Sequence, residues 1–167
     1  VISLLFLTAC SSVQTVPKYE ENKNVKWKQV EPPVIVLNLE PGDIIVKEKT
    51  LNPIGMFGHV AVMKNDKTIV DYPKLGNKSY TIDIDYWLEE GRDILVLRYK
   101  DMTDEFKKRL VKNMGKYFGK DYRISSDKMN TEGFYCSQYI WYIYYITAQE
   151  MGFELDLDSD GGSFVLP

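Results

Sequence analysis

Residues 133–145 read GFYCSQYIWYIYY, and this stretch opens a segment whose apolar side chains recur at helical spacing. We expect a helix over about 136–151 that packs through one broad apolar face and ends at Gly152. Cys136 falls in its first turn. There it is either a small apolar packing residue or a nucleophile at the positive end of the helix dipole. At the level of this stretch alone both interpretations stay open.

The segments before this helix alternate like β-strands. The stretch 58–72 reads as a hairpin that turns at 64–67, and a strand follows the turn at Pro41-Gly42. A second helix is expected from the N-cap Thr103 to Gly119, because its apolar residues have the helical period. This order predicts an α+β domain in which a small antiparallel sheet packs against helices. Its expected strands cover 44–46, 58–72, 79–84 and 93–100.

The bulk composition is that of one compact domain. The chain has 167 residues, a formal net charge of −3 and a single histidine, His59. Its lysines alternate with acidic residues, so no concentrated basic face is available for nucleic acid. One cysteine and one histidine in the domain fall short of a zinc site. We therefore expect a monomer with no cofactor, no metal and no nucleic-acid partner.

The first ten residues, VISLLFLTAC, are too short to span a bilayer and are typical of the apolar core and cleavage site of a secretory signal. Their end resembles a bacterial lipobox, with Cys10 as the acylated residue; the alternative is a buried strand that ends in cysteine. Residues 11–33 are polar and end in Pro32-Pro33, which is typical of a tether. The domain is then expected over 34–167, on a lipoprotein anchored to a membrane of the bacterial cell envelope.

A thiol is a good nucleophile as the thiolate, which a helix N-terminus and a neighbouring imidazole both favour. Cys136 is placed for the first effect, and His59 is the candidate for the second. In the run GHVAV, Val60 and Val62 are expected to point to one face, and His59 and Ala61 to the other. We expect the His59 face to have room for a helix packed on the sheet.

Asp71 is the candidate third member of this group. It interrupts an apolar run on the strand that follows the His59 strand, and a carboxylate in such a place needs a polar partner. About six residues on each side of the turn centred on 65–66 would bring positions 59 and 71 opposite each other. Asp71 could then orient the imidazole, as the third group does in nucleophilic hydrolases.

Five motifs resemble those of a known family, the permuted branch of the NlpC-type papain-like cysteine hydrolases (the YiiX/YebB/YycO-like group). The resemblance covers residues 39–167, and in that branch the histidine strand precedes the cysteine helix. It implies a circularly permuted papain-like fold. The family often has Glu at the place of Asp71 and two residues after the nucleophile, where this chain has Gln138. The motifs are LEPGDII (39–45), FGHVAVM (57–63), TIVDYP (68–73), FGKDY (118–122) and FYCSQYIWYIYY (134–145).

Carried over residue by residue, the resemblance implies that Cys136 is the nucleophile, His59 the general base and Asp71 the residue that orients His59. The backbone N–H of Cys136 is a candidate donor to the oxyanion. Tyr135, Tyr122 and Ser137 are further candidates for oxyanion or substrate contacts.

The expected function is therefore cleavage of an amide bond, in a cell-wall peptide, through a thioester intermediate. An acyl-lipid hydrolase or acyltransferase on the same triad is the first alternative. A non-catalytic envelope module that binds a peptide or lipid is the second.

Overall fold

The computed structural model describes residues 27–29, 38–51, 56–158 and 161–167. Its centre is a six-stranded antiparallel sheet in the order β1-β6-β2-β3-β4-β5. The expected signal peptide and Cys10 lie outside the described residues. The strands are β1 (Trp27–Gln29), β2 (Ile44–Lys47), β3 (His59–Met63), β4 (Thr68–Asp71), β5 (Tyr80–Asp83) and β6 (Ile94–Tyr99).

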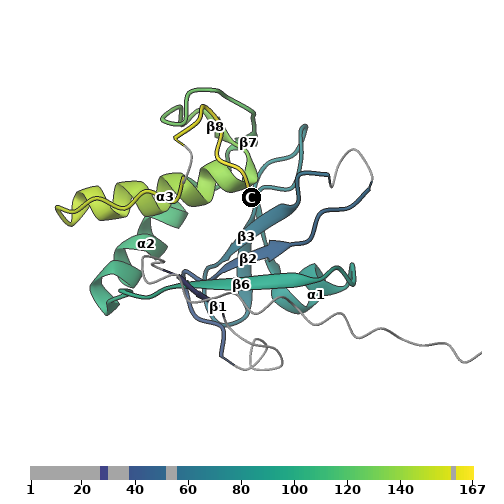
Figure 1. The fold of residues 1–167 in the computed structure, drawn as a ribbon, viewed down its shortest axis with the longest axis horizontal. Helices are drawn as coiled ribbons and strands as arrows, with labels where there is room; N and C mark the ends of the chain where they lie inside the picture. The colour runs from purple at the N-terminus through teal and green to yellow at the C-terminus, as the bar shows by residue number, and fades with distance from the viewer. Residues whose placement is uncertain (1–26, 30–37, 52–55, 159–160) are drawn as a thin grey trace, which may run out of the picture.

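In the part of the chain that the structure describes, three helices cover the two faces of this sheet. α2 (Asp104–Lys116) and α3 (Cys136–Glu150) lie together on one side, and the short α1 (Ile84–Leu88) lies on the other (Figure 1). A two-stranded parallel ladder, β7 (Asp121–Tyr122) with β8 (Gly133–Phe134), leads into α3. The expected α+β class is confirmed, and so are the hairpin and the two long helices; α1 was not expected. Within the described residues, no helix is long and apolar enough to cross a membrane.

The alternation of the strands divides the apolar residues into two cores. Val60 and Val62 of β3 belong to the larger core, under α2 and α3. Ala61 and Met63 belong to the smaller core, which packs against α1. Since successive side chains of a strand point to opposite faces, this division is the one that the sequence predicts for β3.

The folded part begins earlier than the sequence analysis placed it. Trp27–Gln29 fall inside the stretch assigned to the tether, yet they form β1 and pair with β6 from Trp27–Tyr99 to Gln29–Leu97. This pairing covers an edge of β6 that would otherwise present open backbone hydrogen-bonding groups. These three residues of the expected tether thus form an edge strand of the sheet.

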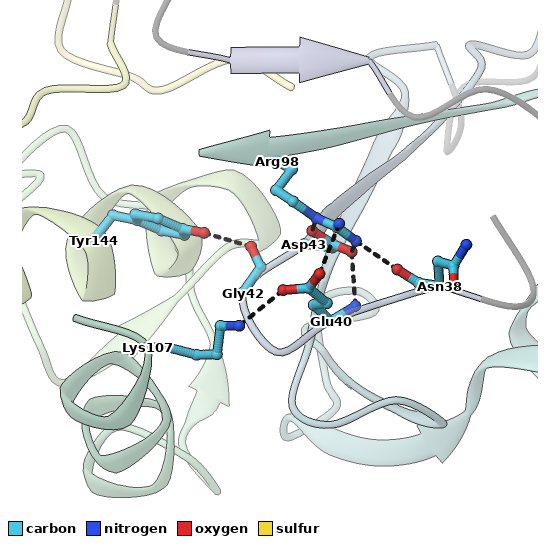
Figure 2. Close-up of polar contacts among 7 residues, drawn as sticks. All are labelled: Asn38, Glu40, Gly42, Asp43, Arg98, Lys107 and Tyr144. Atoms are coloured by element: carbon cyan, nitrogen blue, oxygen red, sulfur yellow. Dashed lines mark hydrogen bonds and ion pairs between the residues drawn. The ribbon is translucent and has the colours of Figure 1, made fainter. Parts of the chain in front are cut away.

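A buried polar cluster fixes the turn before β2 (Figure 2). The Asp43 carboxylate is fully buried and accepts from Arg98 Nε at 2.7 Å and Arg98 Nη2 at 2.6 Å. Arg98 Nη1 also donates to Glu40 at 2.8 Å, and Lys107 of α2 donates to the second Glu40 oxygen at 2.8 Å. A forked arginine contact of this kind satisfies a buried carboxylate with defined geometry.

The same turn holds α3. The Tyr144 hydroxyl donates to the Gly42 carbonyl, which joins the middle of α3 to the turn (Figure 2). Gly42 has φ of +95°, and a Cβ there would lie 2.8 Å from Met102 and 3.0 Å from Leu110. Glycine is therefore required both for the backbone conformation and for the close approach of the helical layer.

Replacing Arg98 with methionine should lower the free energy of unfolding by about 3 kcal/mol, because the buried Asp43 carboxylate would lose its paired charge. Urea denaturation measures the change. The matched control is Arg109→Met, which removes an exposed ion pair with Glu105 and should cost less than about 1 kcal/mol. Equal losses in the two variants would contradict the role given to the cluster.

Candidate active site

His59 and Asp71 meet across the β3–β4 hairpin as diagonal neighbours. The ladder pairs Val62 with Val70, and continuing this register places Asp71 across from Ala61, two residues from His59. The expected direct opposition of 59 and 71 is therefore wrong, because the hairpin is centred on residue 66, whereas direct opposition would need it to be centred on residue 65. The side chains still meet, with His59 Nε2 2.7 Å from Asp71 Oδ1, since diagonal neighbours on one face are within reach of long side chains.

The Asp71 carboxylate is almost completely buried and receives three donors from three elements. His59 of β3 engages Oδ1, while Tyr80 of β5 donates to Oδ2 at 3.0 Å and Trp87 of α1 donates to Oδ2 at 3.1 Å. Buried carboxylates are stable when their lone pairs are satisfied in this way. The carboxylate is thus held in one orientation toward the imidazole.

Trp87 is itself held by Lys47. The Lys47 ammonium lies 3.8 Å from the centre of the Trp87 ring, donates to the Trp87 carbonyl and pairs with Glu90 at 3.0 Å. The Trp87 ring also lies 5.9 Å from the His59 ring. Sequence reasoning did not find Tyr80 or Trp87, because aromatic residues at such places are usually interpreted as packing residues. It did not find Lys47 either.

The helix that carries Cys136 covers the opposite face of the sheet from the one expected. α3 packs over Val60 and Val62, whereas His59 contacts Trp87 on the α1 side. His59, which is hydrogen-bonded to Asp71, nevertheless lies near enough to Cys136 for the two groups to interact and raise the pKa of the imidazole. This is possible because His59 is the first residue of β3, where the side chain lies at the end of the sheet and not over its middle.

Cys136 is the first residue of α3 and is 7% exposed. Burial by itself lowers the pKa of His59, but hydrogen bonds to Asp71 and Cys136, with the negative charges of both groups, raise it to about 10 overall. His59 therefore holds a proton at neutral pH. Because Nε2 engages Asp71, Nδ1 is the ring nitrogen that remains for the thiol. Tyr135, the N-cap residue, makes no side-chain capping bond to the first turn.

Tyr122 is brought to Cys136 by the β7–β8 ladder. Tyr122 pairs with Phe134, two residues before the cysteine, and its hydroxyl lies near enough to Cys136 for the two groups to interact. Burial, followed by the charges of Cys136 and Asp71, raises the pKa of the Tyr122 hydroxyl, which therefore remains a donor. The close ladder requires Gly133, where a Cβ would lie 2.6 Å from a backbone oxygen of β7.

Tyr135 and Ser137 have other hydrogen-bond partners. The Tyr135 hydroxyl accepts from the Val165 N–H at 2.8 Å, and the Ser137 hydroxyl donates to the Val165 carbonyl at 2.6 Å. Of the three side chains considered for oxyanion or substrate contacts, Tyr122 is therefore the one that remains as a candidate beside the thiol. The other two hold a distant segment of the chain.

The comparisons with known proteins concern the fold. No protein-family model matches the chain, and no curated protein matches it significantly. Among solved structures, the crystal structure of the metalloprotein YiiX (DUF1105) from Escherichia coli O157:H7 matches with a TM-score of 0.50. The identity is 20%, and the match covers 66% of this chain and 67% of the other. The chain therefore has a YiiX-like fold, and at this identity the likeness shows the fold alone.

The matched YiiX structure is that of a metalloprotein. Within the described part of this chain, no group of three or more His, Cys, Asp or Glu side chains is placed to hold a metal ion. The site as it stands is formed by a thiol, an imidazole, a carboxylate and a phenol. These are groups that move protons and form covalent bonds to carbon.

The stability of the protein should fall as pH rises through the alkaline range. The pKa of His59 is about 10 in the folded protein, against 6.5 for an ordinary histidine. The stabilisation is therefore complete below pH 6.5, and it is lost progressively as pH rises toward 10, where the folded protein also releases the proton. Melting temperatures measured across this window should decline more steeply for the wild type than for His59→Gln. Parallel curves would contradict the pKa shift.

Proposed function

We propose that this protein is a cysteine hydrolase of the permuted papain-like, NlpC-type group, with Cys136 as nucleophile, His59 as acid and base, and Asp71 as the residue that orients His59. The observation that carries the proposal is the arrangement of the three groups: His59 Nε2 lies 2.7 Å from Asp71 Oδ1, and Cys136, the first residue of α3, is near enough to His59 to help raise the pKa of the imidazole. The order of these residues along the chain, with histidine before cysteine, fits the permuted branch.

The first half of the reaction forms a thioester. An imidazolium beside the thiol favours the thiolate, which attacks the carbonyl carbon of the substrate. The tetrahedral intermediate then collapses, the bond from carbon to the leaving group breaks, and His59 gives its proton to the leaving amine. Asp71 keeps the imidazole oriented and its positive charge compensated during these steps.

The second half returns the enzyme to its starting state. Neutral His59 takes a proton from water, the resulting hydroxide attacks the thioester carbonyl, and the acid product leaves as the thiolate is released. Two donors are available for the oxyanion in both halves: the backbone N–H of Cys136 at the helix N-terminus and the hydroxyl of Tyr122.

For the substrate we propose an amide bond of a cell-wall peptide, and for the location a lipid anchor on Cys10 at the surface of a bacterial envelope membrane. Both rest on the sequence motifs. An acyl-lipid substrate is the second candidate, and the exposed apolar side chains beside Cys136 favour it: Phe164 and Leu166 are 45% and 65% exposed. A non-catalytic binding module would keep the fold without a reactive thiol.

The reactivity of Cys136 separates these possibilities. In a full-length Cys10→Ser chain, where Cys136 is the remaining thiol, iodoacetamide should react at about pH 6.5 at least about tenfold faster than in the same chain with His59→Ala. The His59→Ala rate should instead rise with pH as it does for an ordinary thiol. Asp71→Asn should give an intermediate rate, because the imidazole would lose its charged partner.

Two results would contradict the proposal that the protein is an enzyme. A wild-type rate that follows the ordinary thiol profile and ignores His59→Ala would favour the binding module. Absence of labelling before unfolding would mean that Cys136 is a packing residue. Hydrolysis of peptidoglycan fragments or phospholipids that is lost in Cys136→Ala then distinguishes the two substrate classes.

Tyr122→Phe should lower kcat for a hydrolysed probe by about 10²-fold, as loss of one oxyanion donor does in other hydrolases. Alkylation by iodoacetamide develops no oxyanion, so its rate should change much less than kcat. Tyr139→Phe is the matched control, because it removes a phenol hydroxyl of α3 that donates to the Met114 carbonyl. Equal losses of kcat in both variants would remove Tyr122 from the mechanism.

A further inference from the structure

Residues 164–167, which we call the strap, are attached to both neighbours of Cys136. The Val165 N–H donates to the Tyr135 hydroxyl at 2.8 Å, and the Val165 carbonyl accepts from the Ser137 hydroxyl at 2.6 Å. Both backbone groups of Val165 are thus bound to side chains that flank the thiol. The Val165 side chain is 5% exposed and belongs to the larger core.

The strap also reaches the strand that carries His59. The Pro167 Cβ lies 3.8 Å from the place that a Cβ on Gly58 would occupy, which is ordinary van der Waals contact. Gly58 directly precedes His59. Figure 1 shows the end of the chain beside the N-terminal end of α3 and beside β3. The strap therefore extends from the start of the nucleophile helix to the start of the histidine strand.

The outward side chains of the strap are apolar and exposed. Phe164 is 45% exposed and Leu166 is 65% exposed, on either side of the buried Val165. The Phe164 ring lies 6.4 Å from the ring of Tyr135, the residue before Cys136. No residue of the strap is charged. Large apolar side chains held exposed beside a reactive group are typical of a binding surface.

We propose that the strap determines the specificity of the site: Phe164 and Leu166 contact an apolar group of the substrate beside the bond that Cys136 attacks. Tyr135 and Ser137 are positioning residues, which act through Val165 and not on the oxyanion. The inference rests on the proposed function for its reaction. It adds the chemical class of the group that the site accepts.

The first test uses the thiol alone and needs no hydrolysis. In the full-length Cys10→Ser chain, we compare the rates at which Cys136 adds to N-phenylmaleimide and to 3-maleimidopropionic acid, each divided by the rate for glutathione. The apolar reagent should be preferred by about tenfold. Phe164→Ser with Leu166→Ser should reduce the preference by at least about fivefold, because the apolar contact area is removed. A wild-type preference equal to that of glutathione would overturn the proposal.

The control for this pair is Phe153→Ser. Phe153 is 36% exposed but lies just beyond the far end of α3, in contact with Phe106, and its loss should leave the preference unchanged. Because Phe164 and Leu166 are exposed, their replacement does not endanger folding. An unchanged preference in the Phe164/Leu166 variant, or an equal fall in the Phe153 variant, would overturn the proposal.

The two hydroxyls are tested with Tyr135→Phe combined with Ser137→Ala. Release of the strap should lower the preference for the apolar maleimide. A role on the oxyanion would instead change the rates of both maleimides alike, because both additions form an enolate, and would leave the preference unchanged. Tyr139→Phe with Thr147→Ala removes two other hydroxyls of α3 and is the matched control. An unchanged preference in the Tyr135/Ser137 variant would overturn the positioning role.

A fatty acyl chain and an apolar amino-acid side chain both offer the required group. Turnover of p-nitrophenyl octanoate and of the p-nitrophenyl ester of N-acetyl-leucine distinguishes them, since the ester with the larger loss of kcat/KM in the Phe164/Leu166 variant identifies the source. Unchanged values for both esters would overturn the proposal. If neither ester is turned over, the hydrolase proposal fails, while the maleimide preference still decides the role of the strap.

Discussion

The buried carboxylate of Asp71 is the constraint that organises the site. A charge with 2% exposure is stable when its oxygens are hydrogen-bonded, and the donors come from β3, β5 and α1. The hydrogen bonds to Asp71 therefore require both the position of α1 against the sheet and the diagonal placement of His59. The imidazole gains its orientation from a group that also joins three elements of the fold.

The proposed nucleophile is held by a different cluster. Cys136 belongs to α3. Tyr144, in the middle of this helix, is hydrogen-bonded to the turn before β2, where Asp43 pairs with Arg98 of β6. The histidine and the cysteine are thus positioned by two separate polar clusters. The position of the thiol relative to the imidazole depends on the sheet that joins the two clusters, which is rigid because its interior is closely packed.

The sequence predicted the elements better than their contacts. Helical and alternating periods located α2, α3 and the hairpin, and Asp71 was identifiable because it interrupts an apolar run. The donors to Asp71 were missed, since a tryptophan in a five-residue helix has no local signal that distinguishes hydrogen bonding from packing. The partners of Tyr135 and Ser137 lie 30 and 28 residues away, a separation at which local patterns carry no information.

The location of the proposed catalytic pair at the end of the sheet also indicates which segments could influence a substrate. His59 contacts the α1 layer and Cys136 begins the α3 layer, so under the proposed function a substrate carbonyl would approach where the two layers meet. The segments that lie there are the residue before β3, the β7–β8 ladder and the strap, which contribute Gly58, Tyr122 and Phe164. The sheet and helices hold His59 and Cys136 in place. The neighbouring segments are the parts of the fold that could determine which substrate the proposed site accepts.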